Sequence, residues 1–218
     1  MTQHNLTALL AILTTSLFVG CSDPADKVHK SAASEPQKPA APAAPSAKEY
    51  VVRGDGSTIG FVGSKVTGKH NGGFKNFTGA FNVSDGKIVG SPEIRIAMKS
   101  IWADNDRLTG HLKSADFFDV AKFPIATFTA TAIEPEGSAQ KVTGNLNLHG
   151  VAKSVSFPAN IQVADDALTV KAEFAINRKD FNVNYPGKPD DLIRDNVVIK
   201  LDIKATPGPA RPEDQLAN

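Results

Sequence analysis

Several features that mark common classes of protein are scarce or missing in this sequence of 218 residues. The formal net charge is only +1, and no stripe of basic side chains is present to neutralise a phosphate backbone, so nucleic-acid binding is excluded. No Gly-x-Ser-x-Gly motif occurs, and the chain has a single cysteine, Cys21. No pair of carboxylates stands apart from ordinary turn residues. These absences argue against an enzyme.

The five histidines do not show the spacing of metal ligands. His70, His111 and His149 are far apart in the sequence, and each of them lies beside a predicted turn. None belongs to a pair four residues apart or to a motif of the Cys-x-x-Cys kind, which zinc sites use. We therefore expect neither a metal site nor a cofactor.

Long hydrophobic runs are also missing, and the one that comes nearest, residues 6–20, is too short to span a bilayer comfortably. We interpret residues 1–20 as a signal peptide. Residues 17–21, Leu-Phe-Val-Gly-Cys, resemble a bacterial lipobox, in which the cysteine is acylated. Cys21 is therefore predicted to anchor the chain in a membrane, and Ser22 after it suggests the periplasmic face of the outer membrane. The alternative is ordinary secretory cleavage that leaves a free thiol.

The composition divides the remaining chain into three parts. Residues 21–47 are rich in Ala, Pro and Ser and have almost no large apolar side chain, so we expect a disordered tether. Extended at about 3.1 Å per residue, it would reach roughly 80 Å from the membrane. Residues 207–218 are likewise predicted to be a flexible tail. The hydrophobic content of 41% suits one folded domain, at residues 48–206.

Within this domain apolar and polar residues alternate, which is the pattern of half-buried β-strands. The clearest example is residues 168–176, where Leu168, Val170, Phe174 and Ile176 alternate with polar side chains such as Glu173. About eight such strands, separated by turns such as residues 85–86, predict an all-β fold, an antiparallel barrel with an apolar interior.

The stretch from about residue 104 to residue 116 breaks the alternation. Asp104 or Asn105 can cap a helix, and Leu108 and Leu112 then lie four residues apart on one face. We predict one short amphipathic helix, which lies across an apolar part of the barrel.

Two interpretations of the barrel interior remain open at this stage. Ala126, Ala130, Ala132, Gly144 and Ala172 are small residues at positions predicted to face inward, and they would leave a long apolar tunnel. Alternatively, these residues make room for large side chains from across the barrel, in which case the core is solid.

The residues of the central stretch resemble one protein family. Residues 111–119, His-Leu-Lys-Ser-Ala-Asp-Phe-Phe-Asp, followed by Phe-Pro at 123–124, are similar to the central motif of the YceI-like family of lipocalin-like proteins. Further similarity appears at residues 73–79, 142–151 and 175–181, and the resemblance covers nearly all of residues 50–205. It implies a periplasmic lipocalin-like barrel that encloses a polyisoprenoid, a quinone tail, or a fatty acid or its amide.

The alternation and the resemblance together suggest where such a ligand would lie. The residues predicted to line the tunnel are Ile96, Met98, Phe128, Leu146, Leu148, Phe174 and Ile176. Three polar residues are candidates for the tunnel mouth, each with a structural alternative. His111 either binds a ligand headgroup or braces its own helix, and Asp116 lies about one turn after it. Arg178 either binds a ligand or pairs with Asp116 or Asp180. Residues 72–73 and 186–189 are predicted loops, and either is a candidate lid.

Three hypotheses about function follow. The first is a non-enzymatic protein that binds, sequesters or transports a long-chain lipid. The second is a structural or interaction lipoprotein with a solid barrel, and the third is a redox accessory or enzyme that acts on quinones. Barrels of the family implied by the resemblance often form a homodimer, so pairing of two copies is a further expectation.

Overall fold

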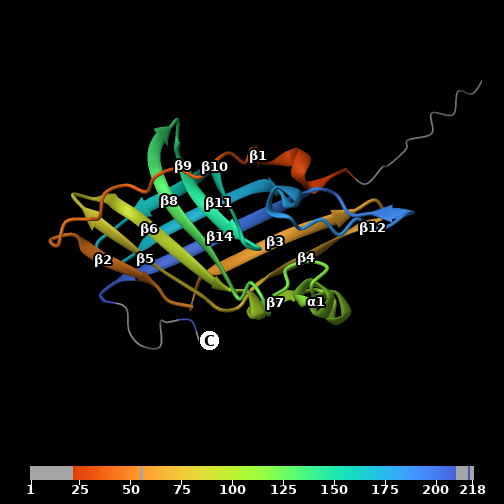
Figure 1. Cartoon of the computed structure of the whole chain (residues 1–218). Helices are drawn as coiled ribbons and strands as arrows, with labels where there is room; N and C mark the ends of the chain where they lie inside the picture. The colour runs from red at the N-terminus through yellow and green to blue at the C-terminus, as the bar shows by residue number, and fades with distance from the viewer. Residues whose placement is uncertain (1–21, 55, 210–215, 217–218) are drawn as a thin grey trace, which may run out of the picture.

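Eight antiparallel strands form a closed ring in the computed structural model, which describes residues 22–54, 56–209 and 216 (Figure 1). Within this set of eight, each strand pairs with the following member of the set, and the last pairs with the first. In order they are β2 (Lys48–Val52), β5 (Phe77–Ser84), β6 (Lys87–Ala97), β8 (Ile125–Glu136), β9 (Ala139–Leu148), β10 (Val151–Val163), β11 (Leu168–Asn177) and β14 (Asn196–Pro207). The predicted barrel of about eight antiparallel strands is confirmed.

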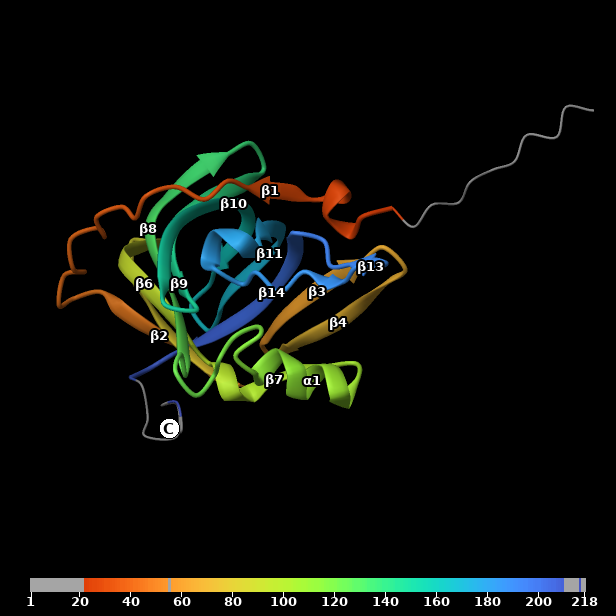
Figure 2. The same ribbon diagram turned by 45° about the vertical axis from the view of Figure 1, so that its right-hand side comes forward.

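Three further strands extend one side of the barrel wall. β3 (Thr58–Lys65) continues the direction of β2 and pairs with β14, and β4 (Gly68–Phe74) pairs with β3. β7 (Ile101–Ala103) follows β6 after the short 3-10 turn η2 (Met98–Ser100) and pairs with β4. The result is a long hairpin of β3 and β4 that projects beyond the ring beside the helix (Figure 2).

Gly72 and Gly73 were predicted to lie in a mobile loop, and this prediction is wrong. Both are in strand β4. A side chain at Gly72 would meet the ring of Phe61 at 2.2 Å, and one at Gly73 would meet the carbonyl oxygen of Ile59 at 2.6 Å. The two glycines are therefore explained by close packing against β3 and β7, and neither of them acts as a hinge.

The helix α1 (Asp106–Lys113) is shorter than the predicted stretch of 104–116. Its N-cap is Asn105, whose side-chain oxygen accepts a hydrogen bond from the backbone N–H of Leu108 at 3.0 Å. Leu112 is buried in a cluster with Ile101, Phe117 and Val183, and Leu108 packs against the same cluster. The apolar face of α1 thus covers one end of the barrel, as the spacing of its leucines predicted.

The connection from β11 to β14 lies near the same end. It contains the 3-10 turn η3 (Arg178–Phe181) and a small hairpin of β12 (Gly187–Lys188) and β13 (Asp191–Leu192). The predicted loop at 186–189 is part of this hairpin. Backbone hydrogen bonds attach the connection to the β3–β4 hairpin, from Val66 N–H to the Leu192 carbonyl at 3.2 Å and from Arg194 N–H to the Ser64 carbonyl at 2.9 Å.

Residues 22–47 do not form the disordered tether that their composition predicts. They run along the outside of the barrel, beginning with η1 (Pro24–Lys27) and β1 (His29–Ser31), and β1 pairs in parallel with β11 (Figure 2). Ala25 is buried against Val62, Ala175 and Val198. The segment has few apolar side chains, but it docks largely through backbone hydrogen bonds, which do not depend on composition.

The predicted C-terminal tail begins inside a strand. Pro207 is the last residue of β14, and the N–H of Gly208 donates to the carbonyl of Glu49 at 3.0 Å. Most of the remaining tail, and also the predicted signal peptide and Cys21, lie outside the described residues. No helix within residues 22–54 and 56–209 is long and apolar enough to cross a membrane.

Candidate functional site

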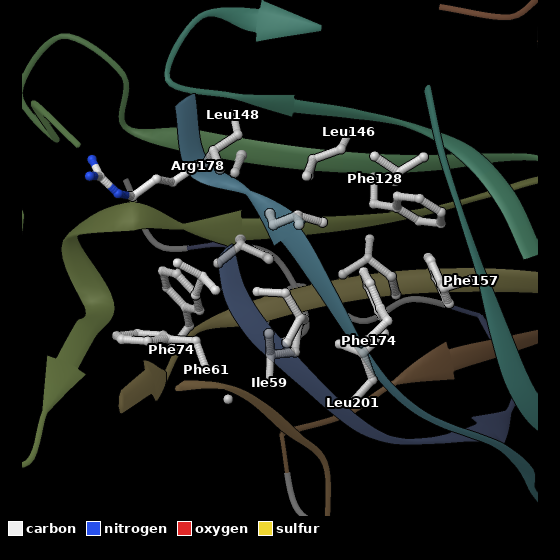
Figure 3. Close-up of a pocket in the computed structure, with 18 of the residues that line it drawn as sticks. Ile59, Phe61, Phe74, Phe128, Leu146, Leu148, Phe157, Phe174, Arg178 and Leu201 are labelled. Carbon is white, nitrogen blue, oxygen red and sulfur yellow. The ribbon is translucent and has the colours of Figure 1, made fainter. Parts of the chain in front are cut away.

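The barrel encloses a cavity of about 420 Å³. Its wall consists almost entirely of apolar side chains that the alternating strands direct inward, and Figure 3 shows them converging from opposite sides of the barrel. A volume of this size lies within the range of about 300–1,000 Å³ that small-molecule sites occupy. The second alternative for the interior, a solid core, is therefore wrong.

All seven residues predicted to line a tunnel do line this cavity. Ile96 and Met98 reach it from the end of β6 and from η2, Phe128 from β8, Leu146 and Leu148 from β9, and Phe174 and Ile176 from β11. That they contact a ligand stays a prediction.

The small inward residues have mixed roles. Ala126 and Ala130 line the cavity, as the tunnel interpretation requires. Gly144 instead makes room for a neighbour, because a side chain there would meet the ring of Phe128 at 2.4 Å. Ala132 was assigned to the interior wrongly. A bulge in β8 between Ala130 and Ala132 shifts the alternation by one residue, so Ile133 lines the cavity in its place.

Three aromatic rings pack together inside the barrel. Phe157 and Phe174 are parallel with centroids 3.9 Å apart, and Phe128 lies 5.5 Å from Phe157 (Figure 3). Phe157 was one of several lining residues that the predicted set missed. Others are Phe61 and Phe74 from the β3–β4 hairpin and Ile199 and Leu201 from β14. The assignment of residues 72–73 to a loop concealed the role of the β3–β4 hairpin.

The polar residues of the cavity wall lie together at the end near α1. They are Ser64, Lys65, His70 and Arg178, and the lining at the opposite end is apolar, for example Val142, Ile161 and Ile203. We call the end formed by residues 64–70 and 191–194 the polar mouth.

Two carboxylates hold the polar mouth in shape. Asp191 binds the Lys65 ammonium and also accepts from the N–H and hydroxyl of Thr67, at 3.1 and 2.9 Å. The hydrogen bond from Lys65 lowers the pKa of Asp191 below its ordinary value of 3.8, and the bonds from Thr67 lower it further. Asp104 accepts from the N–H of Asn71 and contacts Nδ1 of His70, both at 2.8 Å, and these bonds lower its pKa too.

Arg178 does not direct its charge into the cavity. Its guanidinium donates to the carbonyl oxygens of Val183, Ile193 and Arg194 at 2.5, 3.3 and 3.1 Å, and it lies 3.5 Å from Asp195. Figure 3 shows the polar end of the side chain turned away from the apolar residues. The predicted partners Asp116 and Asp180 are wrong, because the arginine instead ties the β11–β14 connection together.

The side chain of Arg178 is only 6% exposed, and burial lowers the pKa of its guanidinium, with Asp195 acting in the opposite direction. An arginine whose donors are satisfied by fixed carbonyl groups orders the backbone around it. Only the apolar stem of Arg178 therefore contributes to the cavity wall.

His111 and Asp116 form a pair at the edge of the site. Nε2 of His111 lies 2.8 Å from a carboxylate oxygen of Asp116. The His111 ring also meets Phe117 and Tyr185 edge-on, with centroids 4.9 Å away in each case. Neither His111 nor Asp116 belongs to the cavity wall. This geometry favours the structural alternative, in which His111 braces the helix against its surroundings.

The three histidines considered as metal ligands stay apart. His70 pairs with Asp104, His111 with Asp116, and His149 contacts the carbonyl of Phe181 at 3.3 Å. Within the described part of the chain, no group of three or more His, Cys, Asp or Glu side chains could hold a metal ion.

A closed antiparallel barrel of eight strands, with one helix at its end and an apolar cavity inside, defines the class of lipocalin-like barrels. Residues 50–205 match the YceI-like domain, so the chain belongs to the YceI-like family.

Several relatives illustrate this membership. The chain is 37% identical over 120 residues to the proteins called YceI of Salmonella arizonae and Salmonella paratyphi B, and the match covers 51% of this chain and 62% of theirs. Among solved structures, BcnA of Burkholderia cenocepacia is 28% identical with a TM-score of 0.65, over 71% of this chain and 99% of that one. A polyisoprenoid binding domain from Saccharophagus degradans shares the fold, with 19% identity and a TM-score of 0.60, over 73% and 98% of the two chains.

Proposed function

We propose that this protein binds one long-chain apolar lipid inside its barrel and sequesters or carries it without chemical change. The observation that supports this is the cavity itself, whose wall is apolar except at the polar mouth. Each methylene group hidden from water contributes about 0.8 kcal/mol, so such a cavity favours a long hydrocarbon chain over a compact polar molecule.

A polyisoprenoid, such as a quinone tail, is the ligand class that we favour, with a fatty acid or its amide as the alternative. The name of the Saccharophagus degradans domain refers to polyisoprenoid binding, and its fold is that of this chain. The site of action in this proposal is the periplasmic face of the outer membrane, with Cys21 as the lipid anchor. The basis for that placement is the sequence of residues 1–22.

Native mass spectrometry tests the proposal directly. Residues 22–218, secreted into a bacterial periplasm and purified without detergent, should carry a stoichiometric adduct that organic extraction releases. Fragments of prenyl or acyl type would identify the ligand class. A bare mass, together with failure to take up added ubiquinone or fatty acid, would contradict the proposal.

A cavity-filling substitution provides the matched test. Leu146 faces the cavity and its neighbour Asn147 is exposed on the outer face of β9. We expect Leu146→Trp to reduce lipid occupancy on the order of tenfold, because overpacking a filled site costs about 1–3 kcal/mol. Asn147→Trp should retain full occupancy. Equal occupancy in the two variants, with both folded by circular dichroism, would show that the lipid lies elsewhere.

A further inference from the structure

Residues 23–34 are attached to the outside of the barrel, and the first of them lies at the polar mouth. β10 and β11 pair only from Asn160 to Val163 on β10, and their other ends diverge. β1 fills part of this gap. It pairs with β11, the hydroxyl of Ser31 donates to the Ser156 carbonyl at 2.6 Å, and Ser34 exchanges two backbone hydrogen bonds with Ser154 at 2.9 Å. We call residues 23–34 the N-terminal strap.

The strap begins at the polar mouth. The carboxylate of Asp23 accepts from the Ser64 hydroxyl at 3.4 Å and lies 3.8 Å from the guanidinium of Arg194, and its side chain is 11% exposed. Cys21 precedes Asp23 by two residues in the sequence, and two residues of extended chain span at most about 7 Å. The apolar run at 6–20 precedes it directly. If residues 6–21 attach the protein to a membrane, the polar mouth is therefore held close to that membrane.

The mouth also carries an exposed apolar tip. Val66 at the end of the β3–β4 hairpin is 55% exposed, and Leu192 on β13 is 50% exposed. The hydrogen bond between their backbones places them side by side, and their neighbours Lys65 and Ile193 line the cavity. Among the described residues the remaining large exposed hydrophobic side chain is Trp102, on β7 of the same extension.

From this arrangement we propose that the polar mouth docks on a lipid bilayer, with Val66 and Leu192 inserted among the lipids and the strap holding the barrel in this orientation. The partner that contacts Val66 and Leu192 in this proposal is thus the surface of a lipid membrane. The exposed ammonium groups of Lys69 and Lys188 flank the tip and suit the headgroup layer. One acyl chain alone binds a membrane only marginally, and a second contact makes the attachment stable.

The inference builds on the proposed lipid-binding function, because docking at the mouth lets a long-chain lipid pass between bilayer and cavity without crossing water. In this arrangement the barrel lies at the membrane and is not held roughly 80 Å away from it by a disordered tether. The strap shortens the connection to the few residues that precede Asp23.

Tryptophan fluorescence can locate the membrane contact, because Trp102 is the only tryptophan of the chain. In the full chain with Trp102→Phe, a tryptophan is placed either at the tip (Leu192→Trp) or at the opposite end (Asp166→Trp, in the exposed turn between β10 and β11). The proteins are reconstituted in phosphatidylethanolamine–phosphatidylglycerol vesicles that contain brominated lipid. We expect the tip tryptophan to lose emission and the distal one to keep it.

A second variant measures what the tip contributes. Val66→Ser combined with Leu192→Ser should slow lipid transfer from vesicles by about tenfold or more, since two apolar side chains lose their burial. The lipid content of this variant by native mass spectrometry should equal that of the unchanged protein.

The results separate the two proposals. Equal quenching at both ends, or none at the tip, would overturn docking even if the barrel contains lipid. Absence of lipid from every variant would overturn the proposed function, and the quenching pattern would still decide whether the mouth faces the bilayer.

Discussion

Arg178 illustrates how one side chain can organise the rim of a cavity while its charged group is bound by the backbone. Its guanidinium donates to three carbonyl groups of the β11–β14 connection, and its stem faces the cavity. From the sequence alone, this arginine could either bind a ligand or pair with Asp116 or Asp180. The structure shows that backbone carbonyls use the donors, which no sequence pattern specifies.

Replacing Arg178 tests this role. We expect Arg178→Gln to lower the free energy of unfolding by about 3 kcal/mol, because carbonyl groups that share one buried cation lose their donor together. Lys179→Gln is the matched control, since this lysine is 50% exposed and its contact with Asp195 at 3.0 Å is a surface ion pair. Urea unfolding followed by circular dichroism measures both. Equal losses would show that the carbonyl contacts contribute little.

At the scale of elements, the N-terminal strap is the part of the molecule that differs most from expectation. It acts as an additional strand between two diverging members of the barrel, and it supplies hydrogen bonds to the free edges of both. An unpaired strand edge exposes N–H and C=O groups, so covering it stabilises the barrel and protects it from pairing with other chains.

A substitution at Ala25 should release the strap. Ala25 is 1% exposed, whereas Ala32 on the same segment is exposed. We expect Ala25→Arg to accelerate hydrogen exchange at the Ser154 amide, which donates to the Ser34 carbonyl at 2.9 Å, while amides in the β8–β9 pairing keep their protection. Ala32→Arg should leave exchange unchanged. Full protection of Ser154 in the Ala25 variant would mean that the strap docks without this contact.

The whole molecule is a barrel whose interior is only partly filled by its own side chains. The rings of Phe128, Phe157 and Phe174 pack together inside it, and they and other apolar side chains border the remaining space. A ligand that binds the folded state alone stabilises it in proportion to the logarithm of its concentration over Kd. The proposed lipid would therefore contribute to stability as well as function.

Removal of the lipid should be visible in thermal unfolding. At a concentration of 100 times Kd a ligand adds about 2.7 kcal/mol, which for a protein of this size corresponds to roughly 5–10 °C in Tm. We expect that shift when protein delipidated by organic extraction and refolded is compared by calorimetry with protein as purified. Adding a long-chain quinone should restore Tm, and a short-chain, water-soluble quinone should not. An unchanged Tm would argue against a lipid in the cavity.

The sequence alone determined the type of fold and most of the cavity wall. Alternation with a period of two is a local property, and in a closed barrel every inward position faces the same space, so Leu146, Leu148, Phe174 and Ile176 could be assigned correctly. The capped leucine pattern likewise identified α1, although its limits were set too wide. The residues of the family motif indicated the same barrel.

The tertiary structure alone decided whether the barrel is hollow, and what residues 22–47, Gly72, Gly73 and Arg178 do. Whether Gly144 leaves a space or admits the Phe128 ring depends on a neighbouring strand. The bulge at Ala130 reverses the alternation, and the strap docks through backbone groups that every sequence possesses. These outcomes depend on contacts between residues far apart in the chain, whereas periodicity and composition report only on local preference.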